Sequence, residues 1–464
     1  MELNLCDLQG FVARGYSGRS FPVASFLLAR IHDAASGREF LGRILAEITT
    51  GQLWNGKKPG STLNAGFTYA GLAQLGLPEP TLQSFPVEFV QGMKSRGKIL
   101  GDTGADDPAN WETIWQQDGN VHMWIGIYAE SKAALEDRCR KISAAMLETR
   151  GATVLQTQEA GALVIGGEVS TKEHFGYSDG FGNPDIQGLC RKPTPGQGKL
   201  TDHGKWVPLA TGEYLIGYPD EACELPVSPI PYLLASNGTY MVYRKLHENV
   251  ATFRKFLKER GGQYGGGEKK LAAKLVGRWL DGTPLELSPD TENIDIVKDD
   301  ARNTNFTYGK DSDGARCPLG SHIRRTNPRD AFGFSGQLVN RRRIMRRGLP
   351  YGTYVPDDQP VRDDGEHGII FMALCASLFR QFEFIQQQWV QHGNDAHLGN
   401  DKDPLLGNQC DQDRFVIPGD TTPKNPPFVC PHLPDFVNLL GGEYFFLPSI
   451  TALRMIAEGG VDPR

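Results

Sequence analysis

The chain has 464 residues, a length that fits two or three domains and can bury enough surface to fold without disulfides or metals. Hydrophobic residues make up 39% of it and charged residues 22%, which excludes a largely disordered protein. The formal net charge of −6 argues against a chain built to bind nucleic acid or an anionic membrane, and no run of about 18 apolar residues indicates a membrane span.

The first third of the chain alternates between two hydrophobic periods. Apolar residues at every second position predict strands, and apolar residues three or four positions apart predict helices. A glycine just beyond a periodic stretch ends such a helix, and Gly151 has that place. In chain order the pattern predicts a strand at 26–30, a helix at 40–48, strands at 63–69 and 121–127, and a helix at 135–146.

The later half repeats the same plan. Short apolar runs predict strands, and the longer stripes that follow them predict helices. The glycine-rich segment 261–267 is expected to be a flexible connector. The predicted elements are strands at 213–218 and 240–246, a helix at 250–257, a strand at 368–376, a helix at 378–389 and a closing strand at 443–447.

Two consecutive sets of strands and helices are typical of the split βαβ, ferredoxin-like arrangement. We therefore expect an α+β protein with two ferredoxin-like domains, 1–200 and 201–464, each an antiparallel sheet with helices packed on one side. Between the elements lie stretches rich in Gly, Pro, Asn and Asp, at 176–212, 281–320 and 391–432. Loops this long in compact domains are usually functional or disordered, so we expect the chemistry there.

One segment, 316–347, has a charge unlike the rest of the chain. It contains nine arginines and one acid, Asp330, which gives a local charge of +8 in a molecule of net charge −6. A solvated basic face, a nucleic-acid contact and a site for an anionic ligand are the three interpretations. The acidic chain and the lack of interleaved aromatics count against nucleic acid; the other two stay open.

His322 lies inside this segment, in CPLGSHIRRTNPRD. A lone histidine makes structural hydrogen bonds more often than it binds a ligand. Here Pro318 and Gly320 favour a fixed turn before it, and Arg324 and Arg325 follow closely. An imidazole binds iron while arginines pair with the carboxylates of an anionic porphyrin. The pattern therefore indicates a candidate porphyrin site, with a purely structural histidine as the alternative.

Asp179 lies in a glycine-rich motif, HFGYSDGFGNP, at 174–184. Aspartate before glycine is ordinary turn chemistry, and a simple turn is one interpretation. The other is functional: Gly176, Gly180 and Gly182 would let the backbone approach a flat ligand closely and present the carboxylate above it. Neither this motif nor the one around His322 decides the matter alone.

Together the motifs are informative. GYSDG, HIRRTNPR and RIMRRGLPYG occur in the order and at separations comparable to those of the dye-decolourising peroxidases, a family of haem b enzymes that this chain resembles. LQGFVARGY, LNAGFTYAGLAQLGLP, NGTYMVYRKLHENV and DPLLG are also similar to that family, so the resemblance covers nearly the whole chain. It also implies two ferredoxin-like domains, in agreement with the predicted elements.

The resemblance implies a role for each motif. His322 is the implied proximal ligand of the haem iron, and Asp179 the implied distal acid–base residue. Arg324 or Arg325 would anchor a haem propionate. A carboxylate within about one water of a bound peroxide can move a proton from one oxygen to the other.

The third motif supplies the distal arginine. In the family this arginine stands four residues before the proline of a P-(Y/F)-G turn, and counting back from Pro350 gives Arg346. Some relatives have an asparagine two residues after it, where this chain has Gly348, so that hydrogen bond is absent. An arginine stabilises developing negative charge without giving up its proton. If this count is out of register, the role of distal arginine falls on a neighbour: Arg342, Arg343 or Arg347.

The second nitrogen of a ligating imidazole usually has a carboxylate partner. The run QHGNDAHLGNDKD at 391–403 offers Asp395, Asp401 and Asp403, and its two histidines, His392 and His397, also resemble a metal cluster. A solvated loop, support for His322 and a separate metal are three alternatives. We assign no residue there.

We therefore expect a peroxidase that contains haem b (iron protoporphyrin IX), reduces hydrogen peroxide to water and oxidises small-molecule donors such as dyes and phenolics. A haem carrier or iron-release protein with incidental peroxidase activity is the alternative, and a haem-free anion-binding protein is a second. The eight scattered cysteines form no CxxC pair, and the start MELNLCDLQG lacks the pattern of a secretory signal. We expect a cytoplasmic location, no nucleic-acid or membrane partner, and leave an oligomer open.

Overall fold

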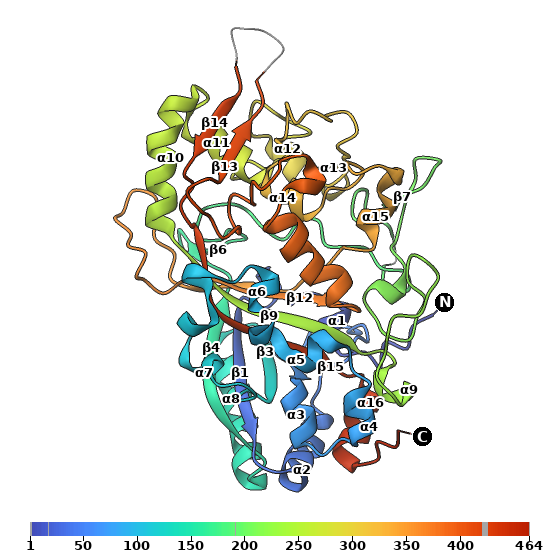
Figure 1. The fold of residues 1–464 in the computed structure, drawn as a ribbon. Helices are drawn as coiled ribbons and strands as arrows, with labels where there is room; N and C mark the ends of the chain where they lie inside the picture. The colour runs from blue at the N-terminus through green and yellow to red at the C-terminus, as the bar shows by residue number, and fades with distance from the viewer. Residues whose placement is uncertain (1, 17, 191, 420–425, 464) are drawn as a thin grey trace.

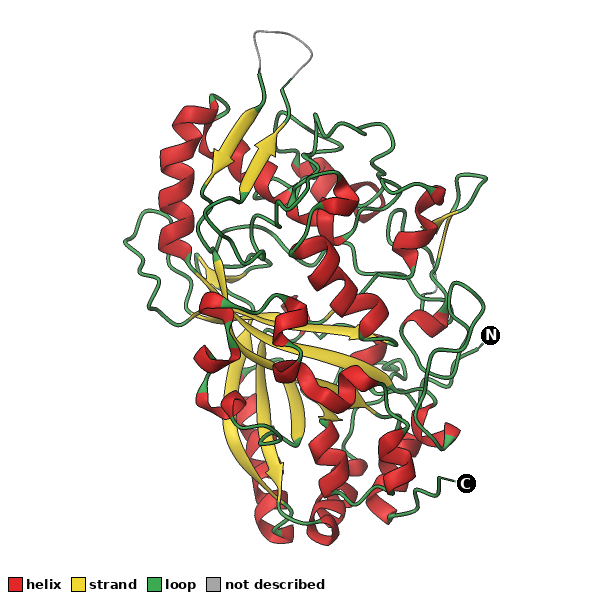
Figure 2. Cartoon of the chain, viewed as in Figure 1, coloured by secondary structure: helices red, strands yellow, loops and turns green. Residues whose placement is uncertain are grey.

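A computed structural model describes the chain except for residues 1, 17, 191, 420–425 and 464. A large sheet crosses the middle of the molecule, with helices around its lower half and with helices and long loops above it (Figures 1 and 2). Of the predicted loop 391–432, residues 420–425 lie outside the described part of the chain.

The N-terminal half of the sheet is one ferredoxin-like unit. Its strands pair antiparallel in the order β2-β3-β1-β4. Capping side chains begin its two long helices: Asp33 accepts from the N–H groups of Ala35 and Ser36, and Ser131 accepts from that of Ala134. The elements are β1 (Val23–Ile31), α2 (Ala34–Leu45), β2 (Ser61–Phe67), β3 (Met123–Ala129), α8 (Lys132–Thr149) and β4 (Ala152–Gly161).

The C-terminal half has the same topology. Its strand order is β10-β12-β9-β15, with β11 also paired with β12, and each pairing is antiparallel. The elements are β9 (Thr239–Glu248), α10 (Val250–Tyr264), β10 (Met345–Arg346), β11 (Leu349–Gly352), β12 (His367–Cys375), two consecutive π-helical segments (Phe379–Glu383 and Ile385–Val390) and β15 (Val437–Leu447). Two ferredoxin-like units with antiparallel strands confirm the predicted α+β class.

The two halves form one continuous nine-stranded sheet. They meet where Phe446 of β15 pairs with Phe67 of β2. Helix α16 (Ile450–Glu458) then packs on α2, so the end of the C-terminal half covers the N-terminal half. One hydrophobic core runs through both halves, and burial of this apolar surface is the main stabilising contribution.

Shorter elements surround the sheet. Among the described residues, no helix is both long and apolar enough to cross a bilayer. The remaining helices are α1 (Gly10–Ala13), α3 (Tyr69–Gln74), α4 (Glu79–Gln83), α5 (Val87–Ser95), α6 (Gly97–Leu100), α7 (Thr113–Gln116), α9 (Tyr232–Ala235), α11 (Gly267–Val276), α12 (Ile294–Val297), α13 (Asp300–Asn303), α14 (His322–Thr326) and α15 (Gln337–Asn340). The remaining strands are β5 (Val164–Ile165), β6 (Glu168–Val169), β7 (Lys199–Leu200), β8 (Trp206–Val207), β13 (Arg414–Ile417) and β14 (Phe428–Pro431).

Two predicted elements are wrong. The apolar run 213–218 is no strand: its start lies in a short 3-10 turn, Thr211–Glu213, and the N–H groups of Tyr214 and Leu215 both donate to Thr211. Segment 261–267 is no flexible connector, because α10 continues to Tyr264 and α11 begins at Gly267. The predicted division near residue 200 falls at β7 and stays a prediction.

Candidate functional site

The carboxylate of Asp179 is presented by a short antiparallel ladder. Its N–H group donates to the carbonyl of Thr171 at 2.9 Å, and Lys172 and Ser178 form an isolated bridge. We call residues 171–184 the distal loop. The N–H group of Ser178 donates to Leu280, which ties the loop to the C-terminal half. The backbone before Asp179 is therefore fixed on both sides.

Glycines shape the same loop. Gly176, Gly180 and Gly182 have φ angles of +97°, +98° and +77°, a region that residues with a Cβ atom rarely adopt. A Cβ atom placed on Gly180 or on Gly182 would meet no other atom within 4 Å. The loop thus faces open space beside Asp179, as the functional interpretation of the motif requires.

Arg346 pairs with Asp179. Its Nη1 lies 3.0 Å from Asp179 Oδ1, its Nη2 donates to the Phe181 carbonyl at 2.8 Å, and its own N–H group donates to Asn183 Oδ1 at 3.0 Å. Arg346 ends β10, where it pairs with Ala373 of β12. The sheet therefore fixes the arginine, and the arginine in turn fixes the distal loop.

The neighbouring arginines point elsewhere. Arg342 donates to the carbonyl of Arg380, and Arg347 donates to the carbonyls of Phe11 and Val12. Arg343 reaches the distal loop, but only at the carbonyl of Gly182, 3.2 Å away. Of these candidates, Arg346 is the one that touches the Asp179 carboxylate.

The Asp179 carboxylate is accessible yet surrounded by protein. Half of its side-chain surface is accessible, yet burial is the largest single influence on its pKa. Burial acts to raise the pKa, but the Arg346 guanidinium, the Gly180 N–H group and the imidazole of His322 together hold the pKa of Asp179 below its ordinary value. The carboxylate is thus accessible, ionised and within electrostatic reach of His322.

His322 begins α14 and is held from behind by Asp403. Its Nδ1 lies 3.0 Å from Asp403 Oδ2, and the Asp403 side chain is fully buried. Asp403 Oδ1 accepts from the N–H groups of Leu405 and Leu406, both at 2.9 Å. About a quarter of the His322 side-chain surface is accessible, so Nε2 remains for a ligand. Of the three alternatives for segment 391–403, support for His322 is therefore what Asp403 provides.

Asp403 keeps its charge inside the protein. Burial acts to raise its pKa, but His322, Arg325 and the Leu406 N–H group lower it below the ordinary value. An ionised partner fixes the orientation of the imidazole and makes its other nitrogen a better ligand.

Arg324 and Arg325 hold the segment around His322. Arg324 is 3% exposed and donates to Asp311 and to the carbonyl of Cys317. Arg325 donates to three backbone carbonyls, of Trp389, His392 and Asp401. These donors stabilise the loops on either side of Asp403, and the predicted contact of Arg324 or Arg325 with a propionate stays a prediction.

The basic segment is not a solvated face. The structure describes all nine of its arginines, and among them only Arg316 is exposed. Arg329 and Arg343, together with Arg278 from outside the segment, form an arginine group with Arg346. Burial and the neighbouring arginines lower the pKa of Arg278 to about 10 and that of Arg329 to about 9. Apart from the pair of Arg346 with Asp179, these arginines form no salt bridge among the described residues, and positive charge gathered inside a protein in this way favours an anionic ligand.

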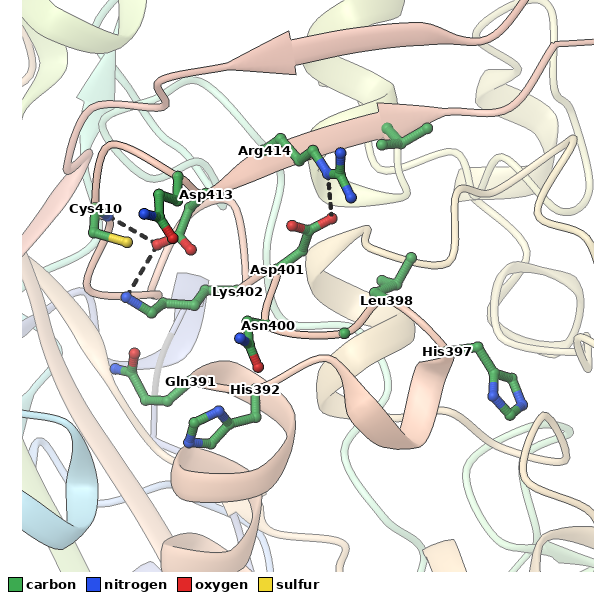
Figure 3. Close-up of a pocket in the computed structure, with 13 residues that line it drawn as sticks. Gln391, His392, His397, Leu398, Asn400, Asp401, Lys402, Cys410, Asp413 and Arg414 are labelled. Carbon is green, nitrogen blue, oxygen red and sulfur yellow. Dashed lines mark hydrogen bonds and ion pairs between the residues drawn. The ribbon is translucent and has the colours of Figure 1, made fainter.

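A separate depression lies behind the loop of Asp403. Its volume is about 740 Å³, and His392, His397, Asp401, Cys410 and Arg414 are among its lining residues. Figure 3 shows the two imidazoles directed away from each other. Within the described part of the chain no group of three or more His, Cys, Asp or Glu could hold a metal ion. The metal interpretation of segment 391–403 therefore has no support.

Comparison with known proteins agrees with this geometry. The family model described as "DyP dimeric alpha+beta barrel domain" matches residues 18–160, and the model "Dyp-type peroxidase, C-terminal" matches residues 233–402. The multifunctional dye peroxidase DyP2 of Amycolatopsis is 30% identical over 85% of this chain and 82% of its own length. The chain belongs to the dye-decolorizing peroxidase family.

Other relatives of this family match over almost the whole chain. Peroxidase 2 of Mycetinis scorodonius is 29% identical, covering 97% of this chain and 87% of that protein. The structure of an ancestral D-type dye-decolorizing peroxidase superposes with a TM-score of 0.80 at 28% identity, covering 98% of this chain and 99% of that one. A dye-decolorizing peroxidase in complex with 2,6-dimethoxyphenol gives 0.82 at 25% identity, covering 98% and 100%.

Membership of the dye-decolorizing peroxidase family defines the reaction class. The protein is a hydrogen-peroxide-dependent peroxidase, an oxidoreductase, and the family implies a haem cofactor. The residues that the sequence did not select are Asp403 and the arginines at 278, 329 and 343. Asp403 opens the family-like motif DPLLG, which was a usable signal; the charge of segment 316–347 indicated Arg329 and Arg343 as part of a cluster, whereas only the fold adds Arg278 to it.

Proposed function

We propose that the protein is a haem b peroxidase in which His322 ligates the iron and Asp179 and Arg346 handle the proton of hydrogen peroxide. The observation that carries this proposal is a pair of groups within electrostatic reach of each other: a histidine held by a buried carboxylate, and an ionised carboxylate held by an arginine. The glycines of the distal loop leave open space beside Asp179.

The residues present fit a haem. Asp403 occupies Nδ1 of His322 and leaves Nε2 as an iron ligand. The glycine-lined face of the distal loop would accommodate a flat ring. For the propionates we favour Arg278, Arg329 and Arg343, where burial and neighbouring arginines lower the pKa values, over Arg324 and Arg325, which have Asp311 and Asp403 beside them.

When bound, the haem would supply the redox centre that gives electrons to hydrogen peroxide and regains them from the organic donors. Asp179, as a carboxylate, would take the proton from the inner oxygen of hydrogen peroxide and deliver it to the outer oxygen, so that water leaves. Arg346 would stabilise the negative charge that develops on the peroxide. Its second donor, on the Phe181 carbonyl, holds the guanidinium in place during this transfer.

The electron donors that we propose are phenolics and dyes. A similar protein was solved with 2,6-dimethoxyphenol, and several relatives have dye-decolorizing names. A cytoplasmic location remains part of the proposal; the eight free cysteines are consistent with a reducing compartment.

Absorption spectroscopy combined with substitutions tests the assignment. The purified protein should show a Soret band that changes on addition of one equivalent of peroxide, and His322→Ala should lose the haem. Asp179→Asn should keep the haem but lose most peroxide turnover. A colourless protein that takes up no added haem would contradict the cofactor, and full turnover in Asp179→Asn would contradict the role of Asp179.

A further inference from the structure

The turn before Asp179 is held by a carboxylate of the distal loop itself. Glu173 Oε2 accepts from the N–H group of Phe175 and Glu173 Oε1 from that of Tyr177, each at 2.7 Å. In the backbone the N–H group of Glu173 donates to the Tyr177 carbonyl. The Glu173 side chain therefore closes the tip of the same ladder that presents Asp179 at its open end.

A second carboxyl group comes from the C-terminal half of the sheet. Glu248 ends β9, and its side chain makes a hydrogen bond with that of Glu173. Both residues are buried, with 8% of Glu173 and 3% of Glu248 exposed, and Glu248 also interacts with the backbone N–H group of His174. Two carboxyl groups share a hydrogen bond only when one is protonated. Because Glu173 already accepts two N–H groups, the proton belongs to Glu248.

The two carboxyl groups are not neutralised by a direct salt bridge within the described part of the chain. Neither carboxyl group has an ion-pair partner among the residues that the structure describes. Burial, with the nearby imidazoles, lowers the pKa of His174 to about 4, so this neighbour is neutral at ordinary pH. The titratable and charged groups around the pair are His174, Tyr177 and Asp179 on the distal loop, His247 on β9, Arg254 on α10, Tyr351 on β11, Tyr354 after it, Asp363, and His367 on β12.

The proton on Glu248 persists above the usual range for a glutamic acid. Burial raises the pKa of Glu248 well above its ordinary value, and the negative charge of Glu173 raises it further. A carboxyl group whose pKa is raised in the folded state stabilises the fold while it is protonated, and this contribution is lost as the pH rises through the raised value. Loss of the proton leaves two buried, repelling carboxylates under the distal loop.

We propose that Glu173 and Glu248 are a positioning pair for the distal loop: the Glu173 carboxylate fixes the turn that presents Asp179, and a proton on Glu248 fixes Glu173 to the C-terminal half. The inference rests on the role proposed above for Asp179. It adds an alkaline limit to peroxide turnover that is set behind the loop, by two groups that do not themselves touch the peroxide.

Substitution of each carboxyl group tests the pair in the haem-loaded protein. Glu173→Gln leaves one carbonyl oxygen for two N–H groups, so we expect faster hydrogen exchange at the amides of Phe175 and Tyr177 and about a tenfold or greater fall in the peroxide rate. Glu248→Gln keeps a neutral donor that cannot titrate. We expect it to keep amide protection and peroxide turnover at an alkaline pH where the unmodified protein loses both.

Glu443→Gln is the matched control. Glu443 also accepts from two backbone N–H groups, those of Met93 and Tyr444, but it holds α5 rather than the distal loop. It should alter stability without altering exchange at Phe175 and Tyr177 or the pH profile. If Glu173→Gln does not fold, the comparison of Glu248→Gln with the unmodified protein decides.

Two outcomes separate this proposal from the one on which it rests. Equal alkaline loss of amide protection in Glu248→Gln and in the unmodified protein would overturn the positioning pair, as would normal exchange and turnover in Glu173→Gln. Full turnover in Asp179→Asn would instead overturn the role of Asp179, whatever the exchange shows.

Discussion

The two sides of the site are built in opposite ways. On the side of His322 the partner carboxylate, Asp403, is fully buried and accepts from the imidazole and two backbone N–H groups. On the side of Asp179 the carboxylate and its arginine are accessible, at 50% and 39% of their side-chain surfaces. A group that must hold a metal gains from rigidity, whereas a group that must exchange protons needs access to water and substrate.

Removal of Arg346 should have the largest effect, and it acts on the accessible side. Arg346→Ala removes the donor to Asp179 and the donor to the Phe181 carbonyl, so we expect peroxide turnover to fall by about 10²–10³-fold, the usual effect of losing a transition-state donor. Haem occupancy should stay unchanged in the absorption spectrum, and Arg342→Ala is the control. A haem-free Arg346→Ala protein would show that both sides depend on this residue.

Asp403→Asn should affect the buried side. The amide keeps the size of the carboxylate but loses its charge, so we expect haem affinity to fall by about 10–100-fold, measured by transfer of haem to an acceptor protein. Asp401→Asn, in the same loop, is the matched control because the Asp401 side chain pairs with the exposed Arg414 rather than with His322. Equal affinities in the two variants would remove the distinction between the sides.

The pH profile of peroxide turnover should report on the accessible side of the site, where Asp179 lies. Arg346, the Gly180 N–H group and His322 hold the pKa of Asp179 below its ordinary value against the effect of burial, so the base form persists into acid and is lost only as the pH falls through that lowered value. In Arg346→Gln the pKa should rise and the acid limb should move to higher pH. An unmoved acid limb would show that another group controls it.

The smallest effect is expected at the glycine beside the carboxylate. Gly180→Ala places a Cβ atom in open space, so no clash follows, but the φ of +98° strains any other residue. We expect a loss of about 1–2 kcal/mol in the free energy of unfolding, measured by denaturant titration, with a modest loss of turnover. Gly204→Ala, another left-handed glycine in open space, provides the comparison for strain alone.

Much of the fold could be predicted from the spacing of apolar residues along the chain. The elements that were missed or wrongly predicted have physical causes. The strands around Phe26, Leu63 and Tyr240 were identifiable because one or both faces are buried. Strand β4 was missed because this edge strand is largely solvent-facing and polar. Strands β10 and β11 were hidden by the arginines around them. The run 213–218 misled because a buried apolar segment is also compatible with a turn.

The residues of the site likewise fall into two groups, those with a local sequence signal and those without one. His322, Asp179 and Arg346 could be found because each lies in a short motif with its own local chemistry. Asp403 could be named only as one of three acids, since it meets His322 across 81 residues of sequence. The pair Glu173 and Glu248 has no local signal at all, because only folding brings the two carboxyl groups together and the chemistry of each depends on the other.

The position of β15 has a consequence for biosynthesis. The four strands of the N-terminal half are all present once residue 161 has emerged, but the edge of β2 has no neighbour until residues 437–447 of β15 arrive. An unpaired edge is a template for association with other chains. During translation, more than half of the molecule must therefore be made while one border of the first sheet waits uncovered, which makes the nascent chain a natural client for chaperones that bind extended segments.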